Sequence, residues 1–330
     1  MHLKRLIPLL ILVTVACQFS RATPAVTPPV PTSTATAIPA TLQPYEQYTI
    51  DFLRARTYGG GNIEIDETLE ETEEFTRYSI RYPSDELSIG GIVNVPKGEG
   101  PYPVIVAIHG FVDPALYEPL DYATPLIDGI TREGYIVYHP DLRNYPPSEE
   151  GDNLFRVGMT IDVLNLMALI GAKAGPAELV GTAASDALGL MGHSMGGAIA
   201  LRVLTVSSQV KATVLYATMG GDEIENAQVL FKATPDPAFQ EELEIAPEII
   251  ERISAMNYYG NITSPIQLHH GTLDETIPVS WAEETCATLT NAGVQIECLY
   301  YPDEDHTFRS RVLGQFYEAM LGFYEKHLSP

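Results

Sequence analysis

The sequence is most informative at residues 188–197, which read Leu188-Gly189-Leu190-Met191-Gly192-His193-Ser194-Met195-Gly196-Gly197. The first four residues predict a buried strand, and residues 197–204 predict a helix. Gly192 and Gly196 allow a sharp turn between the two, because side chains two residues before and after Ser194 would collide. The turn exposes the Ser194 hydroxyl at a helix N-terminus, where the helix dipole favours developing negative charge. Ser194 is therefore the candidate nucleophile.

Strands and helices alternate on both sides of this turn. Short apolar runs predict strands at residues 103–108, 135–139, 212–216, 266–269 and 294–300. Helical patterns lie at residues 120–133, 162–170, 197–204, 280–292 and 312–327. Two further strands, 75–82 and 87–95, flank a turn ahead of this series. The alternation predicts an α/β fold with a mostly parallel central sheet and helices on both faces.

The folded part of the chain is expected to be one domain, residues 45–330, which is long enough to bury a large core. Residues 220–261 lie between two predicted strands and are too long for a simple connection, so we expect a small cap over the site. The acidic run at residues 241–251 is interpreted as a solvated helix face.

A serine becomes a strong nucleophile only when a base removes its proton. The candidate base is His306, in Asp305-His306-Thr307-Phe308, directly after a predicted strand. The candidate acid is Asp274, on the loop at the carboxyl end of another predicted strand, where ligands of parallel sheets bind. The order serine, acid, histidine along the chain matches one known arrangement of such triads.

Other residues near these loops are weaker candidates for the base or the acid. We expect His269 and His270 to pack or to form local hydrogen bonds, and His327 to belong to the last helix. Three carboxylates in these loops are expected at the surface: Glu275, Asp303 and Asp305.

The reaction also needs fixed hydrogen-bond donors for the negatively charged tetrahedral intermediate. One donor is expected to be the backbone N–H of Met195, the residue after the nucleophile. The other is expected from the loop after the strand that ends in His109-Gly110, which indicates the N–H of Phe111. We expect His109 to shape this loop.

These motifs, taken in order, resemble the α/β-hydrolase superfamily. The stretch from about residue 75 to residue 327 is similar to the catalytic domain of the prolyl-oligopeptidase and dienelactone-hydrolase-like families. Asn94-Val95-Pro96 and the run 103–110 add to the resemblance. It implies the α/β-hydrolase fold and a triad of Ser194, Asp274 and His306.

The sequence departs from that resemblance in two places. Residues 45–74, between the predicted tether and the first two strands, are too few for the propeller that filters peptides in prolyl oligopeptidases. Asn144 stands where these families commonly have glycine after an arginine. The missing propeller favours esters over peptides as substrates.

We therefore expect a serine hydrolase that cleaves carboxylic esters through an acyl-enzyme. A serine peptidase acting on short peptides would use the same groups and is the first alternative. A catalytically silent binding protein on the same fold is the alternative from another class. The complete set of three catalytic residues disfavours it.

Composition excludes several other classes. The formal net charge of −24, from 43 acidic and 19 basic residues, makes nucleic acid an unfavourable partner. No His-Glu-x-x-His motif is present and the cysteines lack zinc spacing, so we expect neither a metal nor a cofactor. The sequence indicates no oligomeric state.

Residues 1–17 have the form of a bacterial lipoprotein-type signal peptide. Lys4 and Arg5 precede an apolar run at residues 6–15 that is too short to span a bilayer. The run leads into Val13-Thr14-Val15-Ala16-Cys17, which resembles a lipobox, where a lipid is attached to the cysteine. We expect an exported protein of the bacterial cell envelope, anchored to a membrane by a lipid on Cys17. The alternative is an ordinary cleaved signal peptide and a secreted protein.

Residues 18–44 are expected to form a linker. They contain six prolines and six threonines, and proline disfavours both helix and sheet, so the segment should be semi-extended. No stretch after it is predicted to span a membrane.

Cys286 and Cys298 lie in a predicted helix and in the strand that follows it. We expect them to be close in space. A disulfide and a pair of buried thiols remain equal alternatives.

Overall fold

The computed structural model describes residues 43–329. Cys17 and most of the predicted linker lie outside this range, so the domain boundaries at residues 17 and 44 stay predictions. The strands are β1 Glu64–Glu71, β2 Phe75–Ser84, β3 Leu87–Pro96, β4 Tyr102–Ile108, β5 Ile136–Pro140, β6 Ala183–His193, β7 Ala212–Tyr216, β8 Ile266–Gly271 and β9 Ile296–Tyr301. The helices are α1 Ile50–Ala55, α2 Pro119–Arg132, α3 Val157–Gly171, α4 Ala177–Val180, α5 Met195–Val206, α6 Glu223–Ala233, α7 Pro237–Leu243, α8 Pro247–Ile253, α9 Val279–Asn291 and α10 Ser310–Leu328. Short 3-10 helices are η1 Gln43–Tyr48, η2 Pro114–Leu116, η3 Leu154–Arg156 and η4 Ala255–Asn261.

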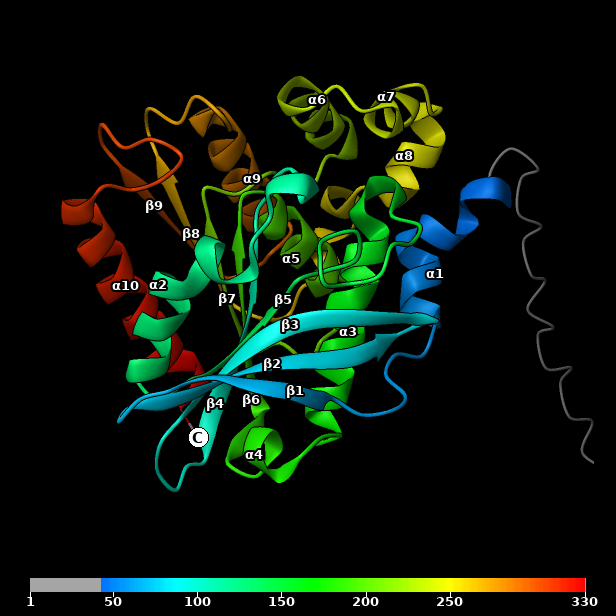
Figure 1. The fold of residues 1–330 in the computed structure, drawn as a ribbon. Helices are drawn as coiled ribbons and strands as arrows, with labels where there is room; N and C mark the ends of the chain where they lie inside the picture. Colours follow the sequence, from blue (N-terminus) through cyan, green and yellow to red (C-terminus); the bar gives the residue numbers. More distant parts are fainter. Residues whose placement is uncertain (1–42, 330) are drawn as a thin grey trace, which may run out of the picture. The chain divides into compact units, whose positions relative to one another are not determined.

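The strands form one nine-stranded sheet in the order β1-β2-β3-β5-β4-β6-β7-β8-β9 (Figure 1). The strands from β5 to β9 in this order are parallel, whereas β1, β2 and β3 run antiparallel to their neighbours. The predicted α/β-hydrolase fold with a mostly parallel sheet is confirmed. Because parallel strands end at the same edge, the loops after β4, β6, β8 and β9 are brought to one side of the domain.

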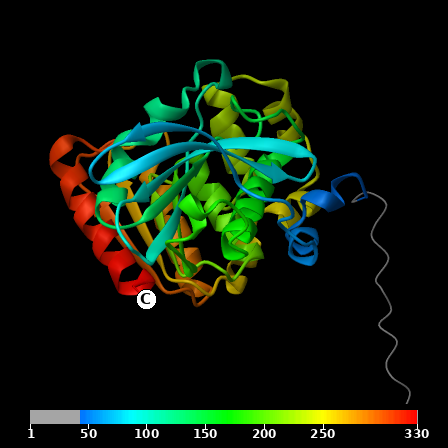
Figure 2. The same cartoon turned by 60° about the horizontal axis from the view of Figure 1, so that its bottom comes forward.

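Strand β1 was not predicted from the sequence pattern. It is strongly acidic and most of its residues are exposed, because it is an edge strand that pairs only with β2. Exposed charges on an edge strand discourage pairing with other chains. Figure 2 shows β1, β2 and β3, coloured blue to cyan, as a twisted antiparallel ribbon.

Alternating side chains of the central strands enter two separate cores. Ile105 and Ala107 of β4 pack in the core formed with α2 and α10. Val104 and Val106 of the same strand pack in the core formed with α3, α5 and α9. This alternation places helices on both faces of the sheet, as predicted.

The structure corrects one expectation about membrane-spanning segments. Within the described residues, Leu154–Gly171 is long and apolar enough to cross a membrane, with 18 residues and a mean hydropathy of 1.6. However, 83% of this stretch is buried inside the domain, where α3 packs against α5 and the sheet. We therefore describe it as a core helix. The sequence pattern had indicated only its second half, residues 162–170.

Residues 220–261, the predicted cap, form α6, α7, α8 and η4 and contribute no strand to the sheet. Figure 1 shows α6, α7 and α8 side by side at the top of the view. The expectation of a fully solvated acidic face is wrong at one position. Glu242 is only 2% exposed, because α7 turns its side chain into the domain.

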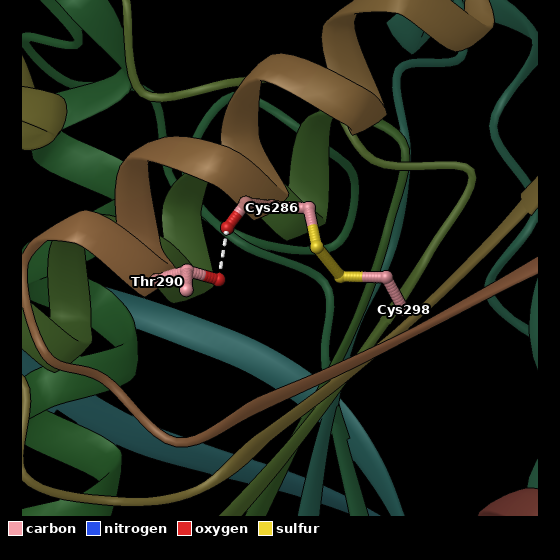
Figure 3. Close-up of a disulfide and its surroundings, with 3 residues drawn as sticks. All are labelled: Cys286, Thr290 and Cys298. Carbon is pink, nitrogen blue, oxygen red and sulfur yellow. Dashed lines mark hydrogen bonds between the residues drawn. A yellow bond between two sulfur atoms is a disulfide. The ribbon is translucent and has the colours of Figure 1, made fainter.

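Cys286 of α9 and Cys298 of β9 are close in space, as predicted, and are joined by a disulfide (Figure 3). Their Cα atoms are 6.5 Å apart. The bridge links two elements that border the candidate site: α9 follows the loop that carries Asp274, and β9 precedes the loop that carries His306.

Candidate active site

Ser194 occupies a sharp turn between β6 and α5. Its backbone has φ 54° and ψ −119°, in a region that residues other than glycine rarely adopt. Two backbone hydrogen bonds hold the turn: the Ser194 N–H donates to the Tyr216 carbonyl (3.0 Å), and the Met219 N–H donates to the Ser194 carbonyl (3.1 Å). Strand β7 and the residues after it therefore fix the strained position of the serine.

The glycines around Ser194 are required by close backbone contacts. A Cβ atom on Gly192 would lie 2.5 Å from the carbonyl oxygen of Gly196. A Cβ atom on Gly196 would collide with the backbone at the end of β4, at Ile108 and His109. Gly196 thus lets α5 start directly against the loop from which the second oxyanion donor is expected.

The structure brings His306 and Asp274 together. His306 Nδ1 lies 2.8 Å from Asp274 Oδ2. Backbone N–H groups of Thr276 and Ile277 donate to Asp274 Oδ1, at 2.9 and 2.8 Å, so both oxygens of the carboxylate are bound. Burial alone would raise the pKa of Asp274, but the hydrogen bonds from His306 and Ile277 outweigh it and lower the pKa below its usual value. The carboxylate is therefore ionised and holds the proton of His306 on Nδ1, which leaves Nε2 able to accept a proton.

His193, the residue before Ser194, connects His306 to the turn that carries Ser194. The ring centroids of His193 and His306 are 5.1 Å apart, and His193 also forms a hydrogen bond with the His306 backbone. On its other side, the His193 ring stacks on Tyr216 at 4.6 Å. Burial, followed by the proximity of His306, lowers the pKa of His193 to about 3, so this ring is neutral. His193 packs His306 against the turn, a contact that the sequence pattern did not indicate.

The other candidates for base and acid have different partners. His269 lies between Tyr301 Oη and Gln267 Oε1, each 2.8 Å away, as expected for a residue that bonds locally. His270 Nε2 is 2.9 Å from the Ile277 carbonyl and 3.3 Å from Asp274 Oδ2, so it supports the acid loop. Glu275, Asp303 and Asp305 are exposed, as predicted, whereas Glu304 in the same loop as His306 is buried.

The expected oxyanion donors, Phe111 and Met195, both line a cavity of about 490 Å³. The cap contributes Phe239 to the same cavity, and its ring meets the Phe111 ring edge-on with centroids 6.1 Å apart. His109 is buried beneath this loop, with its ring nitrogens 2.8 Å from the Gly110 carbonyl and 3.4 Å from the Asp141 carbonyl. These contacts agree with the expected role of His109 in shaping the loop.

Buried charged side chains form a network next to this cavity, and Arg156 and Glu242 of the network line it. Arg156, at the start of α3, bridges Glu242 of α7 and Glu223 of α6, each at 2.6 Å. Arg202 of α5 also contacts Glu223. All four side chains are at most 4% exposed, and none of them was identified from the sequence. One signal could have found them: an arginine within an apolar helix is almost never buried without an acidic partner.

The departure at Asn144 has a structural explanation. Its backbone has φ 69°, in the left-handed region where glycine is usual and asparagine is the next most tolerated residue. Its side chain accepts from the Gly151 N–H (2.8 Å) and donates to the Gly151 carbonyl (3.1 Å). Asn144 therefore meets the same backbone requirement as glycine and also closes the loop over residues 144–151.

Two family descriptions match the chain. The one described as chlorophyllase matches residues 63–237, and the one described as the prolyl oligopeptidase family matches residues 177–330. The chain is a serine hydrolase with the α/β-hydrolase fold, as its motifs predicted. Since the first match covers more than half of its length, the chain belongs to the chlorophyllase family, and its C-terminal half is similar to the prolyl oligopeptidases.

Solved structures with the same fold include peptidases and esterases. The acylaminoacyl peptidase of Pyrococcus horikoshii is 19% identical with a TM-score of 0.64, over 78% of this chain and 42% of that one. Acetyl xylan esterase 1 from a Thermoanaerobacterium species is 16% identical with a TM-score of 0.61, over 87% of this chain and 94% of that one. The acetyl xylan esterase of a Paenibacillus species is 17% identical with a TM-score of 0.62, over 84% and 92%.

The chain thus spans less than half of the acylaminoacyl peptidase but most of the two esterases. None of the curated proteins matches the chain in sequence. Among residues 43–329, no three His, Cys, Asp or Glu side chains are grouped so as to hold a metal ion.

Proposed function

We propose that this protein is a carboxylesterase that works through an acyl-enzyme, with Ser194 as nucleophile, His306 as base and Asp274 as the residue that orients His306. The observation that carries the proposal is the 2.8 Å contact between His306 Nδ1 and Asp274 Oδ2, on a histidine that packs against the residue next to Ser194. The strained turn at Ser194 supports it, because strain of this kind is concentrated at functional sites.

In the first half of the reaction, Ser194 Oγ attacks the ester carbonyl carbon while His306 Nε2 takes the hydroxyl proton. The carbonyl π electrons move to oxygen, and the N–H groups of Met195 and Phe111 bind that oxyanion. The intermediate then collapses as the carbon–oxygen bond to the alcohol breaks. His306 returns its proton to the departing alkoxide, which leaves as the alcohol.

In the second half, a water molecule attacks the acyl-enzyme. His306 accepts a proton from the water and then donates it to Ser194 Oγ, so that the carboxylic acid leaves and the free serine is restored. Asp274 stays ionised throughout and stabilises the imidazolium form of His306. No step requires a metal or a cofactor.

Two observations favour an ester over a peptide. The chain covers most of the length of two acetyl xylan esterases, whereas it covers under half of the acylaminoacyl peptidase. In addition, a cavity beside His306 is lined mainly by apolar side chains. Short-peptide hydrolysis remains a second candidate function, favoured by the match of residues 177–330 to the prolyl oligopeptidase family.

A panel of chromogenic esters with graded acyl length, assayed beside aminoacyl and dipeptidyl anilides, tests this choice. We expect kcat/KM for the best ester to exceed that for the best anilide by several powers of ten. Turnover of an anilide equal to that of the best ester would replace the esterase proposal with the peptidase one.

We also propose that the cap sets the choice of acyl group. Phe239 faces the cavity that contains both expected oxyanion donors, so the acyl part of a bound ester would contact it. Phe239→Ala should change the ranking of substrates with different acyl lengths. An equal loss of activity for every acyl length would mean that Phe239 has only a structural role.

Finally, we propose that the protein is exported and held at a membrane of the bacterial envelope by a lipid on Cys17. The lipobox-like ending of the signal motivates this, and the Cys286–Cys298 disulfide supports export, since disulfides persist mainly outside the cytosol. Cys17→Ala should move the activity from the membrane fraction to the soluble fraction without reducing it. Unchanged membrane partitioning would contradict the anchor, and loss of all wild-type protein to the medium would support the secreted alternative.

A further inference from the structure

A second cavity, of about 260 Å³, lies between α2 and α10 at the carboxyl edge of the sheet. At its outer end is Thr307, an exposed residue directly after His306. Its floor includes Met191 and Phe316, which are 1% and 0% exposed. The cavity therefore leads from the surface beside the proposed base into the core.

This cavity is on the His306 side of the site. Its walls include His193, whose ring packs on His306, and Phe308, two residues after His306. The larger cavity, by contrast, is bordered by Met195 and Phe111, the proposed oxyanion donors. The two cavities thus adjoin different parts of the proposed machinery.

The mechanism decides which part of an ester belongs on each side. The group that leaves in the first half of the reaction must receive its proton from His306, so it has to lie on the histidine side. The acyl group stays bonded to Ser194, with its carbonyl oxygen among the oxyanion donors. The alcohol part is therefore directed towards the cavity between α2 and α10.

The lining of this cavity suits an uncharged, apolar group. Among the described residues, no carboxylate, lysine or arginine side chain lines it. The two tyrosine hydroxyls at its wall are already engaged: Tyr317 donates to the Pro125 carbonyl (3.0 Å), and Tyr216 accepts from the Phe308 N–H (2.7 Å). Its three histidines are neutral at pH 7, because burial lowers the pKa values of His109, His139 and His193 to about 4, 3 and 3. Placing a charged or strongly polar group there would be costly.

We propose that this cavity binds the alcohol part of the substrate, and that the substrate is an ester of an aromatic or branched apolar alcohol. The inference rests on the proposed esterase function and adds the class of alcohol. Leu126 of α2 and Leu313 of α10 both line the cavity.

The test varies the alcohol and the acyl group separately. Leu313→Trp narrows the cavity, and Glu318→Trp, at an exposed position on the same helix, is the matched control. With the acetyl group fixed, Leu313→Trp should lower kcat/KM for 1-naphthyl acetate by about tenfold or more and change ethyl acetate less than about twofold. With 1-naphthol fixed, the loss should be the same for acetyl, butyryl and octanoyl esters. The control variant Glu318→Trp should have the same kcat/KM as the wild type for every ester.

The opposite pattern would overturn the proposal: a loss that grows with acyl length, or an equal loss for ethyl and naphthyl acetate. If Leu313→Trp does not fold, as judged by circular dichroism, Leu313→Ala decides. This wider cavity should raise the preference for naphthyl over phenyl acetate, and an unchanged preference would count against the assignment. Failure of the wild type to cleave any ester would instead reject the esterase function, which keeps the two conclusions distinguishable.

Discussion

Among residues 43–329, two of the places where residues other than glycine have a positive φ hold that backbone conformation by different means. Ser194 has φ 54° between β6 and α5, and glycines two residues away on each side make room for the turn. Phe155 and Arg156 have φ 54° and 57° at the start of α3, where Gly158 lies two residues after Arg156. There, Glu242 of the cap accepts from the Phe155 N–H (2.6 Å), and Arg202 donates to the Phe155 carbonyl (2.7 Å).

The difference separates local from tertiary control of backbone conformation. The turn at Ser194 is specified within a few residues, so the chemistry it supports can be recognised in the sequence. The junction at Phe155 and Arg156 is held by side chains from α5, α6 and α7, far away in sequence. It couples the position of the cap, and with it Phe239, to the core of the domain.

The largest effect on stability is expected at the junction. Arg156→Met leaves the buried carboxylate of Glu242 without its arginine partner and that of Glu223 with only Arg202, which should lower the free energy of unfolding by about 3–5 kcal/mol. The matched control is Arg81→Met, which removes an exposed ion pair with Asp66 and should cost at most about 1 kcal/mol. Urea denaturation measures both. Equal losses of unfolding free energy in the two variants would mean that burial of the network adds nothing to stability.

At the turn, the expected effect is on the rate. Gly196→Ala would push α5 away from the end of β4 and disturb the loop that carries Phe111, so kcat should fall about 10²–10³-fold, as for loss of one oxyanion donor. Gly314→Ala is the control, because an added Cβ on this glycine of α10 meets no atom within 4 Å. Steady-state kinetics on a chromogenic ester compares them. A kcat within twofold of the wild type for Gly196→Ala would show that the turn tolerates a side chain.

The disulfide is a third, covalent way to hold elements beside the site. It closes a short loop, with the two cysteines 12 residues apart, and replacing both cysteines by serine should cost about 2–3 kcal/mol. Calorimetry should show a lower Tm for the double variant, while activity well below that temperature stays within about twofold. An unchanged Tm would show that the disulfide does not contribute to stability.

A pH-dependent effect on stability is expected at Asp141, a buried residue. Burial raises its pKa to about 7, although a hydrogen bond from Tyr117 (2.8 Å) opposes the shift. Since the folded pKa lies above the unfolded one, the stability that Asp141 contributes is full below about pH 4 and is lost as the pH rises through about 7. Asp141→Asn should therefore flatten the decline of stability with pH across that window. Urea midpoints that differ from the wild type by the same amount at every pH would contradict this assignment.

Features that are set by local sequence could be predicted, whereas features that depend on contacts between distant residues could not. Strands β4 to β8 could be recognised because they are largely buried on both faces and read as short apolar runs. Ser194, Asp274 and His306 could be proposed as a triad because each lies in the segment that follows a predicted strand. The acidic edge strand β1 lacks an apolar pattern and was missed. Glu242 was taken for a surface residue, because its partner Arg156 lies 86 positions away and only the folded chain brings them together.

The central claim is that Ser194 is the nucleophile activated by His306 and Asp274. The most direct measurement is labelling of the purified full-length protein with a fluorophosphonate probe, with the modified residue located by mass spectrometry. We predict one label on Ser194 in the wild type, much slower labelling in His306→Ala and Asp274→Asn, and no label in Ser194→Ala. Labelling of another residue, or ester turnover in Ser194→Ala close to that of the wild type, would contradict the account.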